Sequence, residues 1–285
     1  MSTFAKVLLA TDFTPQSDNL TGCLFSLCPD TETEVVLAHV FEDDDDADPG
    51  GSKYKKASSR LTGYKNDLEQ AGYENISVVT PVGDTCKALN DAAEECGADL
   101  MLVASHGKNF LERALMGSTT YELAQEASLP LLINKEDEGG NGEEPDLLSN
   151  IMVPTDFSKK SLEALNIIRS LREHVGKVLF VHIIERGSRS KHDYKDKYSN
   201  AALFLQELVD EMKIFGIKAD FCISKGVASK QIAAISARER TSMIMMARTG
   251  LEISNFSELG STSKNVVLNA ECAVLLLPAE DNEDN

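Results

Sequence analysis

Two segments of the sequence combine glycine with a run of hydroxyl side chains in a pattern suited to holding phosphate. Residues 104–120 read ASHGKNFLERALMGSTT, and residues 247–263 read ARTGLEISNFSELGSTS. Each has Ala-x-x-Gly, nine further residues and then Gly-Ser-Thr, where we expect a helix to begin. Glycine allows close backbone approach, and the amides that open a helix attract anions. The hydroxyls that would add donors are those of Ser118, Thr119, Thr120, Ser261, Thr262 and Ser263.

An aspartate follows the first apolar run of each half. Asp12 lies in KVLLATDFT (6–14), and Asp156 lies in NIMVPTDFS (150–158). A carboxylate at the end of a strand can accept hydrogen bonds from the base or sugar of a ligand. Because each is followed by Phe, a hydroxyl residue and a predicted helix, the same aspartates also suit helix capping. The two interpretations do not exclude one another.

These residues recur because the chain is an internal duplication. The segments around Asp12 and Asp156 align at an offset of 144, and VVLAHV (35–40) aligns with VLFVHI (178–183) at 143. Both glycine-serine segments also align at 143, and a single-residue indel explains the difference. Searching for such repeats first fixes the organisation of the chain.

Short apolar runs alternate with helical patterns in each copy, which predicts a parallel sheet covered on both faces. The fold class is α/β, with two tandem doubly wound domains, each a five-stranded parallel sheet flanked by four helices. In the first copy we expect strands near 5–11, 34–40, 76–80, 99–104 and 130–134. Its helices would follow Thr14-Pro15, span 53–71, cover 88–96 and begin at a capping box of Thr119 and Glu122. In the second copy we expect helices near 159–174, 193–215, 227–239 and 260–270.

The length of 285 residues suits two domains, 1–136 and 148–285, joined by an acidic linker over 137–147. Residues 1–145 carry 10 Lys and Arg against 27 Asp and Glu, a net charge of −17, whereas residues 146–285 carry 18 against 19, a net −1. This balance argues against nucleic acid as a partner. No apolar run approaches membrane-spanning length, and the six cysteines form no C-x-x-C pair, so we expect a cytoplasmic protein with reduced thiols.

Two other groups of residues could do chemistry, and we favour a simpler role for each. The acidic loop 42–48 lacks the regular ligand spacing of a calcium loop, so a solvated loop is favoured over a metal site. His39 and His182 occupy equivalent strand ends, where a hydrogen-bonded structural histidine is commoner than a catalytic one. The sequence has no G-x-S-x-G elbow, Walker A lysine or G-x-G-x-x-G.

Taken together, the Thr-Asp strand ends and the paired glycine loops resemble those of the universal stress protein family, in a tandem form. ATP-binding members carry G-x-x-G, nine residues and G-(S/T) after the fourth strand, with P-T-D after the first. The resemblance covers nearly the whole chain. It implies that the nucleotide-binding residues are Thr11, Asp12, Val40, Ala104, His106, Gly107, Gly117, Ser118, Thr119 and Thr120 in copy one. In copy two it implies Pro154, Thr155, Asp156, Ile183, Ala247, Thr249, Gly250, Gly260, Ser261, Thr262 and Ser263.

The first glycine of the motif is alanine in both copies, Ala104 and Ala247. The resemblance implies ATP, or AMP or ADP, in one or both copies, with magnesium if a triphosphate binds, and slow hydrolysis at most. The protein would act in the stress response as a nucleotide-dependent regulator of protein partners that the sequence does not identify. The two alanines motivate an alternative, a dimerisation scaffold that binds no nucleotide, and a third reading is an enzyme of the wider adenine nucleotide α-hydrolase group. The resemblance also implies that residues 130–134 and 273–277 pair as in a dimer, and a homodimer of chains stays open.

Overall fold

The computed structural model describes residues 3–105, 116–135, 146–185, 191–250 and 259–278. The chain divides into two compact units, unit 1 (Met1–Pro145) and unit 2 (Asp146–Asn285). His106, Gly107 and most of the predicted linker lie outside the described residues.

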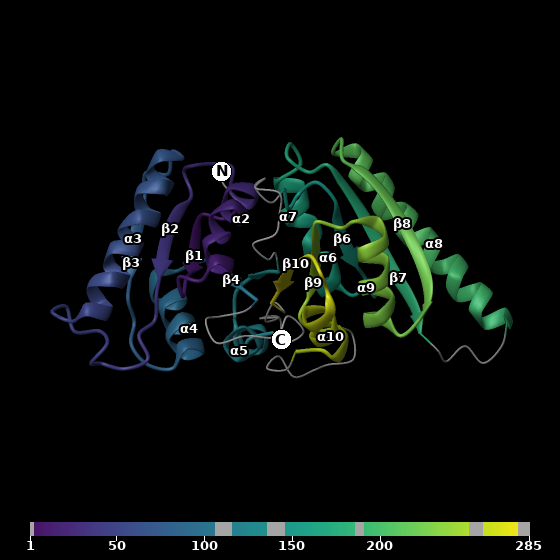
Figure 1. Cartoon of the computed structure of the whole chain (residues 1–285). Coiled ribbons are helices and arrows are strands. Elements are labelled where there is room, and N and C mark those ends of the chain that lie inside the picture. The colour runs from purple at the N-terminus through teal and green to yellow at the C-terminus, as the bar shows by residue number, and fades with distance from the viewer. Residues whose placement is uncertain (1–2, 106–115, 136–145, 186–190, 251–258, 279–285) are drawn as a thin grey trace, which may run out of the picture. The chain divides into compact units, whose positions relative to one another are not determined.

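Each unit alternates strands with helices along the chain (Figure 1). Unit 1 has β1 (Lys6–Ala10), α1 (Pro15–Asp18), α2 (Leu20–Leu27), β2 (Glu34–Ala38), α3 (Ser52–Gln70), β3 (Ile76–Val79), α4 (Thr85–Cys96), β4 (Leu100–Ala104), α5 (Ser118–Glu126) and β5 (Leu131–Asn134). Unit 2 has β6 (Ile151–Pro154), α6 (Lys159–Leu162), α7 (Ala164–Ser170), β7 (Lys177–Glu185), α8 (Lys191–Ile214), β8 (Lys218–Gly226), α9 (Ala228–Glu239), β9 (Met243–Ala247), α10 (Ser261–Asn269) and β10 (Ala273–Leu277).

The strands of unit 1 pair in the order β3-β2-β1-β4-β5, and those of unit 2 in the order β10-β9-β6-β7-β8. The pairs within each unit are parallel. From β1 the chain builds outward to β2 and β3, then returns to place β4 on the other side of β1. The strand order therefore reverses between β1 and β4, and in unit 2 between β6 and β9. In open α/β sheets, ligands bind beyond the carboxyl ends of the strands at such a reversal.

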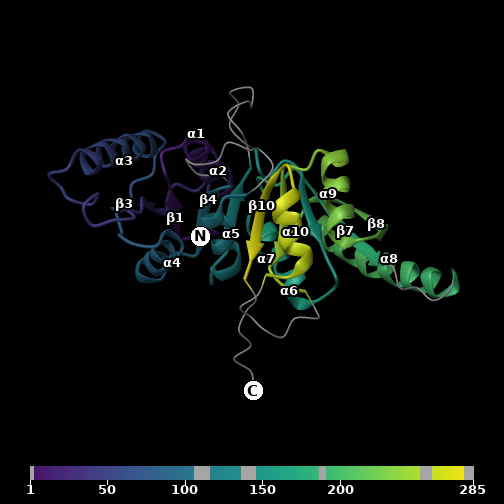
Figure 2. The same ribbon diagram turned by 60° about the horizontal axis from the view of Figure 1, so that its bottom comes forward.

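Helices cover both faces of each sheet, so the central strands are apolar along their whole length. In unit 1, α1, α2 and α3 lie on one face while α4 and α5 lie on the other (Figure 2). The residues of β4 and β9 are largely or fully buried, as are Leu8, Leu9 and Leu37 in the neighbouring strands. This core confirms the predicted α/β fold with a parallel sheet in each unit.

The structure departs from the predicted elements in two places. The single helix expected after the first strand is interrupted at Asn19 in unit 1 and at Glu163 in unit 2. Just before each break the hydroxyl of Ser17 or Ser161 donates to the carbonyl oxygen three residues earlier, and such side-chain bonds compete with the helix backbone. Strands β7 and β8 also run for nine residues each, beyond the lengths of β2 and β3.

None of the described helices combines the length and the hydropathy that crossing a membrane would require.

Candidate functional site

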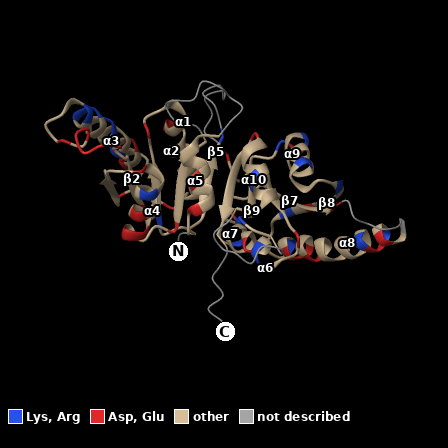
Figure 3. Ribbon diagram, turned by 90° about the horizontal axis from the view of Figure 1, so that it is seen from below, with Lys and Arg blue, Asp and Glu red and all other residues tan. Residues whose placement is uncertain are grey.

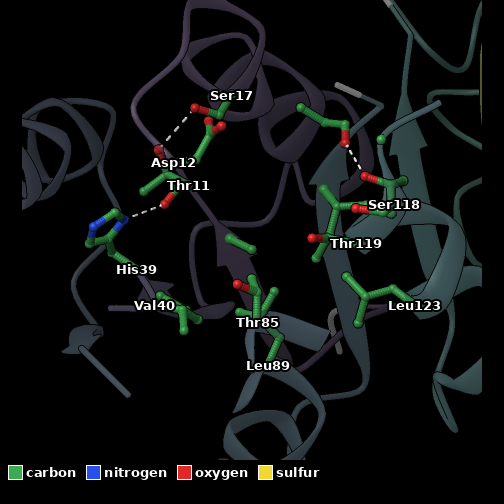
Figure 4. A pocket seen from close by; sticks show the side chains of 16 residues that line it. Thr11, Asp12, Ser17, His39, Val40, Thr85, Leu89, Ser118, Thr119 and Leu123 are labelled. Carbon is green, nitrogen blue, oxygen red and sulfur yellow. Dashed lines mark hydrogen bonds between the residues drawn. The ribbon is translucent and has the colours of Figure 1, made fainter. Parts of the chain in front are cut away.

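A pocket of about 360 Å³ lies at the carboxyl edge of the unit 1 sheet. Figure 4 shows Thr11, Asp12 and His39 on one side of it, and Ser118 and Thr119 across from them. The predicted residues that line this pocket are Thr11, Asp12, Val40, Ala104, Gly117, Ser118, Thr119 and Thr120. The structure thus brings together every predicted site residue of this unit that it describes.

Unit 2 has an equivalent pocket of about 370 Å³ at the same edge of its sheet. The predicted residues that line it are Pro154, Thr155, Asp156, Ile183, Ala247, Thr249, Gly250, Gly260, Ser261, Thr262 and Ser263. Chain segments about a hundred residues apart meet in each pocket, because β1 and β4, and β6 and β9, are adjacent strands.

The aspartate at the end of the first strand supports the helix cap indirectly. Thr14, and not Asp12, is the N-cap of α1, because the Thr14 side chain accepts from the Ser17 amide. Asp12 Oδ1 in turn accepts from the Thr14 amide at 3.0 Å and from its hydroxyl at 2.6 Å. Asp156 makes the same two bonds with Ser158, at 3.0 and 2.5 Å. Each carboxylate is therefore fixed by the capping residue while it lines a pocket. The capping interpretation describes part of its role, and contact with a ligand stays a prediction.

The residue after each aspartate adopts a backbone conformation that the sequence did not predict. Phe13 has φ 62° and Phe157 has φ 66°, in the left-handed region that aromatic residues rarely occupy. The amides of these two residues donate to the hydroxyl oxygens of Thr11 and Thr155, at 3.0 and 2.9 Å. Such strained residues cluster at functional sites. Here the left-handed residue lies between the aspartate and the N-cap of the helix that follows.

The two equivalent histidines hold these kinks in place. His39 Nδ1 lies 2.8 Å from the carbonyl oxygen of Thr11, and His182 Nδ1 lies 2.9 Å from that of Thr155. Each ring also packs against the neighbouring phenylalanine, with centroids 4.3 Å apart for Phe13 and 4.5 Å for Phe157. These contacts agree with the structural role that we favoured.

The Gly-Ser-Thr segments begin helices, as expected, but not through a capping box. Gly117 is the N-cap of α5 and Gly260 that of α10, and neither helix has a side-chain cap bond. The capping box predicted at Thr119 and Glu122 is wrong, because Thr119 is already the second residue of α5. The first amides of both helices therefore lack an intrahelical acceptor and favour an anion at this end.

One hydroxyl of each segment donates a hydrogen bond to the last residue of the preceding strand. The Thr120 hydroxyl donates to the carbonyl oxygen of Ala104 at 2.8 Å, and the Ser263 hydroxyl donates to that of Ala247 at 2.9 Å. Both side chains are buried, whereas Ser118 and Ser261 are exposed. The hydroxyl donors left for a phosphate are thus those of the first two residues of each helix.

The alanines that replace the first motif glycine fit their backbone. Ala104 is the last residue of β4 and Ala247 the last of β9, where extended backbone suits any residue. Gly250 is different, because a Cβ atom there would lie 2.8 Å from Asp156 Oδ2. A side chain at Gly250 would therefore displace this carboxylate oxygen.

Helices α4 and α9 supply pocket residues that the sequence analysis missed. Thr85 and Leu89 of α4 line the first pocket, and Ala228 and Ile232 of α9 line the second. These residues could have been predicted from the position of the helix that follows the third strand. The first turn of that helix also begins at the carboxyl edge of a parallel sheet.

The acidic loop 42–48 lies outside the first pocket. Asp46 forms a 2.7 Å ion pair with Lys53 at the start of α3, and this contact raises the pKa of Lys53. Among the described residues, no three His, Cys, Asp or Glu side chains are grouped so as to hold a metal ion. All six cysteines are free thiols, and burial raises the pKa of Cys28 to about 12.

Comparison with known proteins identifies relatives of both units. A sequence profile of the universal stress protein family matches residues 3–135 and 148–278. Universal stress protein MJ0577 of Methanocaldococcus jannaschii is 28% identical over 81 residues, which span 28% of this chain and 49% of that protein, so the match covers about half of that relative. Universal stress protein MJ0531 of the same organism is 26% identical over 155 residues, 50% of this chain and 88% of that protein.

A solved structure resembles the full length of the chain. A universal stress protein from Archaeoglobus fulgidus aligns with a TM-score of 0.71 and 21% identity, and the alignment covers 99% of this chain and 98% of that one. At this identity the likeness concerns the fold alone. The family profile covers most of both units, and the chain therefore belongs to the universal stress protein family.

Proposed function

We propose that the protein binds ATP, or the related nucleotides ADP and AMP, in its two pockets and acts as a nucleotide-dependent regulator. The observation that carries this proposal is the repeated placement of a strand-end aspartate across a pocket from the open N-terminus of a nine-residue helix. A nucleotide presents its sugar and base as hydrogen-bonding groups at one end and its phosphates as anions at the other. The pocket volumes fall within the usual range for small-ligand sites.

The residues present fit such a ligand. Asp12 and Asp156 would accept hydrogen bonds from the sugar, and the backbones of Val40 and Ile183 would meet the base. The amides that open α5 and α10 would hold phosphate. Magnesium would enter with a triphosphate and be carried mainly by its oxygens.

Binding is favoured over fast catalysis because the polar groups of each pocket already hold one another. In each pocket the histidine Nδ1 is engaged with the carbonyl oxygen of the threonine that follows the first strand, and Thr11 Oγ1 lies 3.0 Å from Ser17 Oγ. We therefore expect a stress-response role in which nucleotide binding, rather than turnover, changes the surface offered to partner proteins. The free thiols suit the reducing cytoplasm, which we propose as its location.

The direct test is calorimetric titration with ATP, ADP and AMP in the presence of magnesium, together with mass spectrometry of nucleotide released from the denatured protein. The control is the double variant Ser118→Asp, Ser261→Asp. Aspartate suits the first turn of a helix, so the fold is kept, but its charge repels a phosphate at both sites. We expect saturable binding by the wild type and none by the variant. Absence of heat and of bound nucleotide in the wild type would refute the proposal.

The methyl groups of Ala104 and Ala247, which line the pockets, favour one alternative, a scaffold that works without nucleotide. Thermal unfolding separates the two functions, because a ligand that binds only the folded state must raise Tm. A Tm unaffected by millimolar ATP would favour the scaffold.

A further inference from the structure

We propose that unit 1 has a further binding site, separate from the candidate nucleotide pocket, and that this site takes a small aromatic carboxylate. The site is a pocket of about 430 Å³ between the first half of α3 and residues 39–46, which follow β2. We call it the α3 pocket. All of its lining residues are described, and its volume falls within the usual range for small-ligand sites. It shares His39 and Val40 with the first pocket, but not the Gly-Ser-Thr segment.

The lining of the α3 pocket includes a row of aromatic rings. Phe13 packs on His39 with ring centroids 4.3 Å apart, and His39 meets Phe41 edge-on at 5.0 Å. These three rings line the pocket. Tyr54 and Tyr64 extend the row, because they stack on its two ends with centroids 5.9 and 6.2 Å away. The row offers an apolar surface on which the ring of a planar ligand can pack.

Helix α3 brings positive charge to the same pocket. Lys53, Lys56 and Arg60 are three and four residues apart, so they share one face of the helix, and all three line the pocket. Lys53 pairs with Asp46 at 2.7 Å, and Arg60 pairs with Asp18 at 3.1 Å. Within the described part of the chain, Lys56 has no such partner. Its ammonium group is therefore the charge that a bound anion would meet.

The charges around the α3 pocket favour an anion with a single negative charge. Two carboxylates, those of Glu42 and Asp46, line the pocket with the three cations, and Lys53 engages Asp46. Unit 1 as a whole carries −17, so every further charge on an anionic ligand is repelled by the unit. A carboxylate brings one charge, whereas a phosphate monoester brings about −1.5 to −2 at neutral pH. The lining thus suits a monocarboxylate joined to an aromatic ring.

Unit 2 differs at the positions that form this site. Helices α3 and α8 align at an offset of 144, which matches their buried residues and the left-handed glycine after each helix. The matched pairs are Leu61 and Leu205, Leu68 and Met212, and Gly72 and Gly216. This register places Phe204 opposite Arg60 and Asn200 opposite Lys56. Phe204 packs on the ring of Phe157 at 5.3 Å. Unit 2 therefore has neither of these two cations, and the proposed site belongs to unit 1.

The direct test is titration of the intact protein with 2-naphthoate, in the absence of nucleotide, followed by the amide chemical shifts in NMR spectra. We expect saturable binding that shifts the amides of Phe41 and Ala57, which line the α3 pocket. The amides of Ser118 and Thr119, which line the first pocket, should not move. The neutral analogue 2-naphthamide has the same rings without the charge, and it should bind about fivefold more weakly.

Charge variants test the site and the sign of the ligand. Lys56→Gln should weaken 2-naphthoate binding about fivefold, the value of one partly exposed ion pair. The control Lys55→Gln removes the same charge from the adjacent exposed lysine, which does not line the pocket, and should change the affinity much less. Glu42→Gln removes a negative charge from the lining and should strengthen binding. All three residues are exposed, so the fold is kept.

Four results would each overturn the proposal. They are the absence of saturable binding at millimolar 2-naphthoate, equal affinity for the neutral amide, equal effects of Lys55→Gln and Lys56→Gln, and shifts that appear at Ser118 and Thr119 but not at Ala57. Stronger binding after Lys56→Gln would likewise show that the pocket prefers a cation. None of these measurements uses a nucleotide, so their failure leaves the proposed nucleotide-binding function intact.

Discussion

Phe13 and Phe157 show how single residues shape both pockets. A left-handed backbone at a residue other than glycine costs about 1–3 kcal/mol, and this chain has it at the same position of both units. The surrounding contacts differ. Arg60 donates to the Phe13 carbonyl oxygen at 3.1 Å and lies over its ring, whereas Phe157 packs against Phe204 of α8. The kink and the histidine beside it recur in both units while these outer contacts do not, so the kink and its histidine are the common requirement.

The contact of Gly250 with Asp156 leads to a prediction at the same scale. Gly250→Ala should weaken nucleotide binding in unit 2 by about tenfold, which corresponds to about 1.4 kcal/mol. Its Cβ would displace Asp156 Oδ2, while Oδ1 stays bound to Ser158. The measurement is calorimetry with ATP in the Ser118→Asp background.

The control is Gly63→Ala, because no atom lies within 4 Å of a Cβ at that helical position. This variant should keep full affinity and gain up to about 1 kcal/mol of unfolding free energy. Unchanged nucleotide affinity of Gly250→Ala would show that binding does not depend on the present position of the Asp156 carboxylate.

Individual site residues could be predicted when their spacing was repeated. Asp12 and the Gly-Ser-Thr segments were found because the second copy places the same types after the same strands. The left-handed backbone of Phe13 could not be predicted, because aromatic residues normally avoid this region and nothing in the sequence marks the exception. The use of the Thr120 hydroxyl on the Ala104 carbonyl was also hidden, since sequence alone does not distinguish a ligand contact from a loop contact.

At the scale of elements, α4 and α9 differ in how they begin. Asp84 caps α4 by accepting from the Lys87 amide at 3.0 Å. The equivalent N-cap of α9 is Val227, which makes no cap bond and is 51% exposed. Both helices line a pocket, so the helix that lines the second pocket has the less stabilised N-terminus.

The repeat thus predicts a reciprocal pair of variants. Val227→Asp should raise the unfolding free energy by about 1 kcal/mol, because the new carboxylate can accept from the amide of Lys230, the counterpart of Lys87. Asp84→Val should lower it by about the same amount. Urea unfolding followed by circular dichroism measures both changes. Changes in unfolding free energy of the same sign for the two substitutions would contradict helix capping as their cause.

Strand positions were predicted well because buried parallel strands are short continuous apolar runs, as in β4 and β9. Helix ends were predicted less well. The break at Asn19 depends on the Ser17 side chain bonding to its own helix, and a helical pattern of apolar residues persists across it. The lengths of β7 and β8 also exceeded the expectation from the first copy, because partly exposed residues extend the ladder at that edge of the sheet.

At the scale of the whole chain, the main asymmetry is charge. Lys, Arg, Asp and Glu mix along α3 and α8 (Figure 3), yet the sequence sums differ by sixteen charges between the units. Self-repulsion destabilises a compact state of high net charge and is screened by salt. The predicted pairing of residues 130–134 with 273–277, and any homodimer, stay predictions.

We therefore expect salt to stabilise unit 1 more than unit 2. Hydrogen exchange of the intact chain, followed by mass spectrometry at 10 and 500 mM NaCl, should show added protection in β1, β2 and β4 that exceeds any in β6, β7 and β9. Equal changes in the two sets of strands would show that the negative charges of unit 1 are spaced too widely to matter.

The repetition of one pocket in both units has a consequence for what the chain could report to a cell. If both pockets bind the proposed nucleotide and do so with different affinities, the chain has a half-filled state between empty and full. A partner that recognised this state would respond to a range of ligand concentration rather than to the presence of the ligand alone.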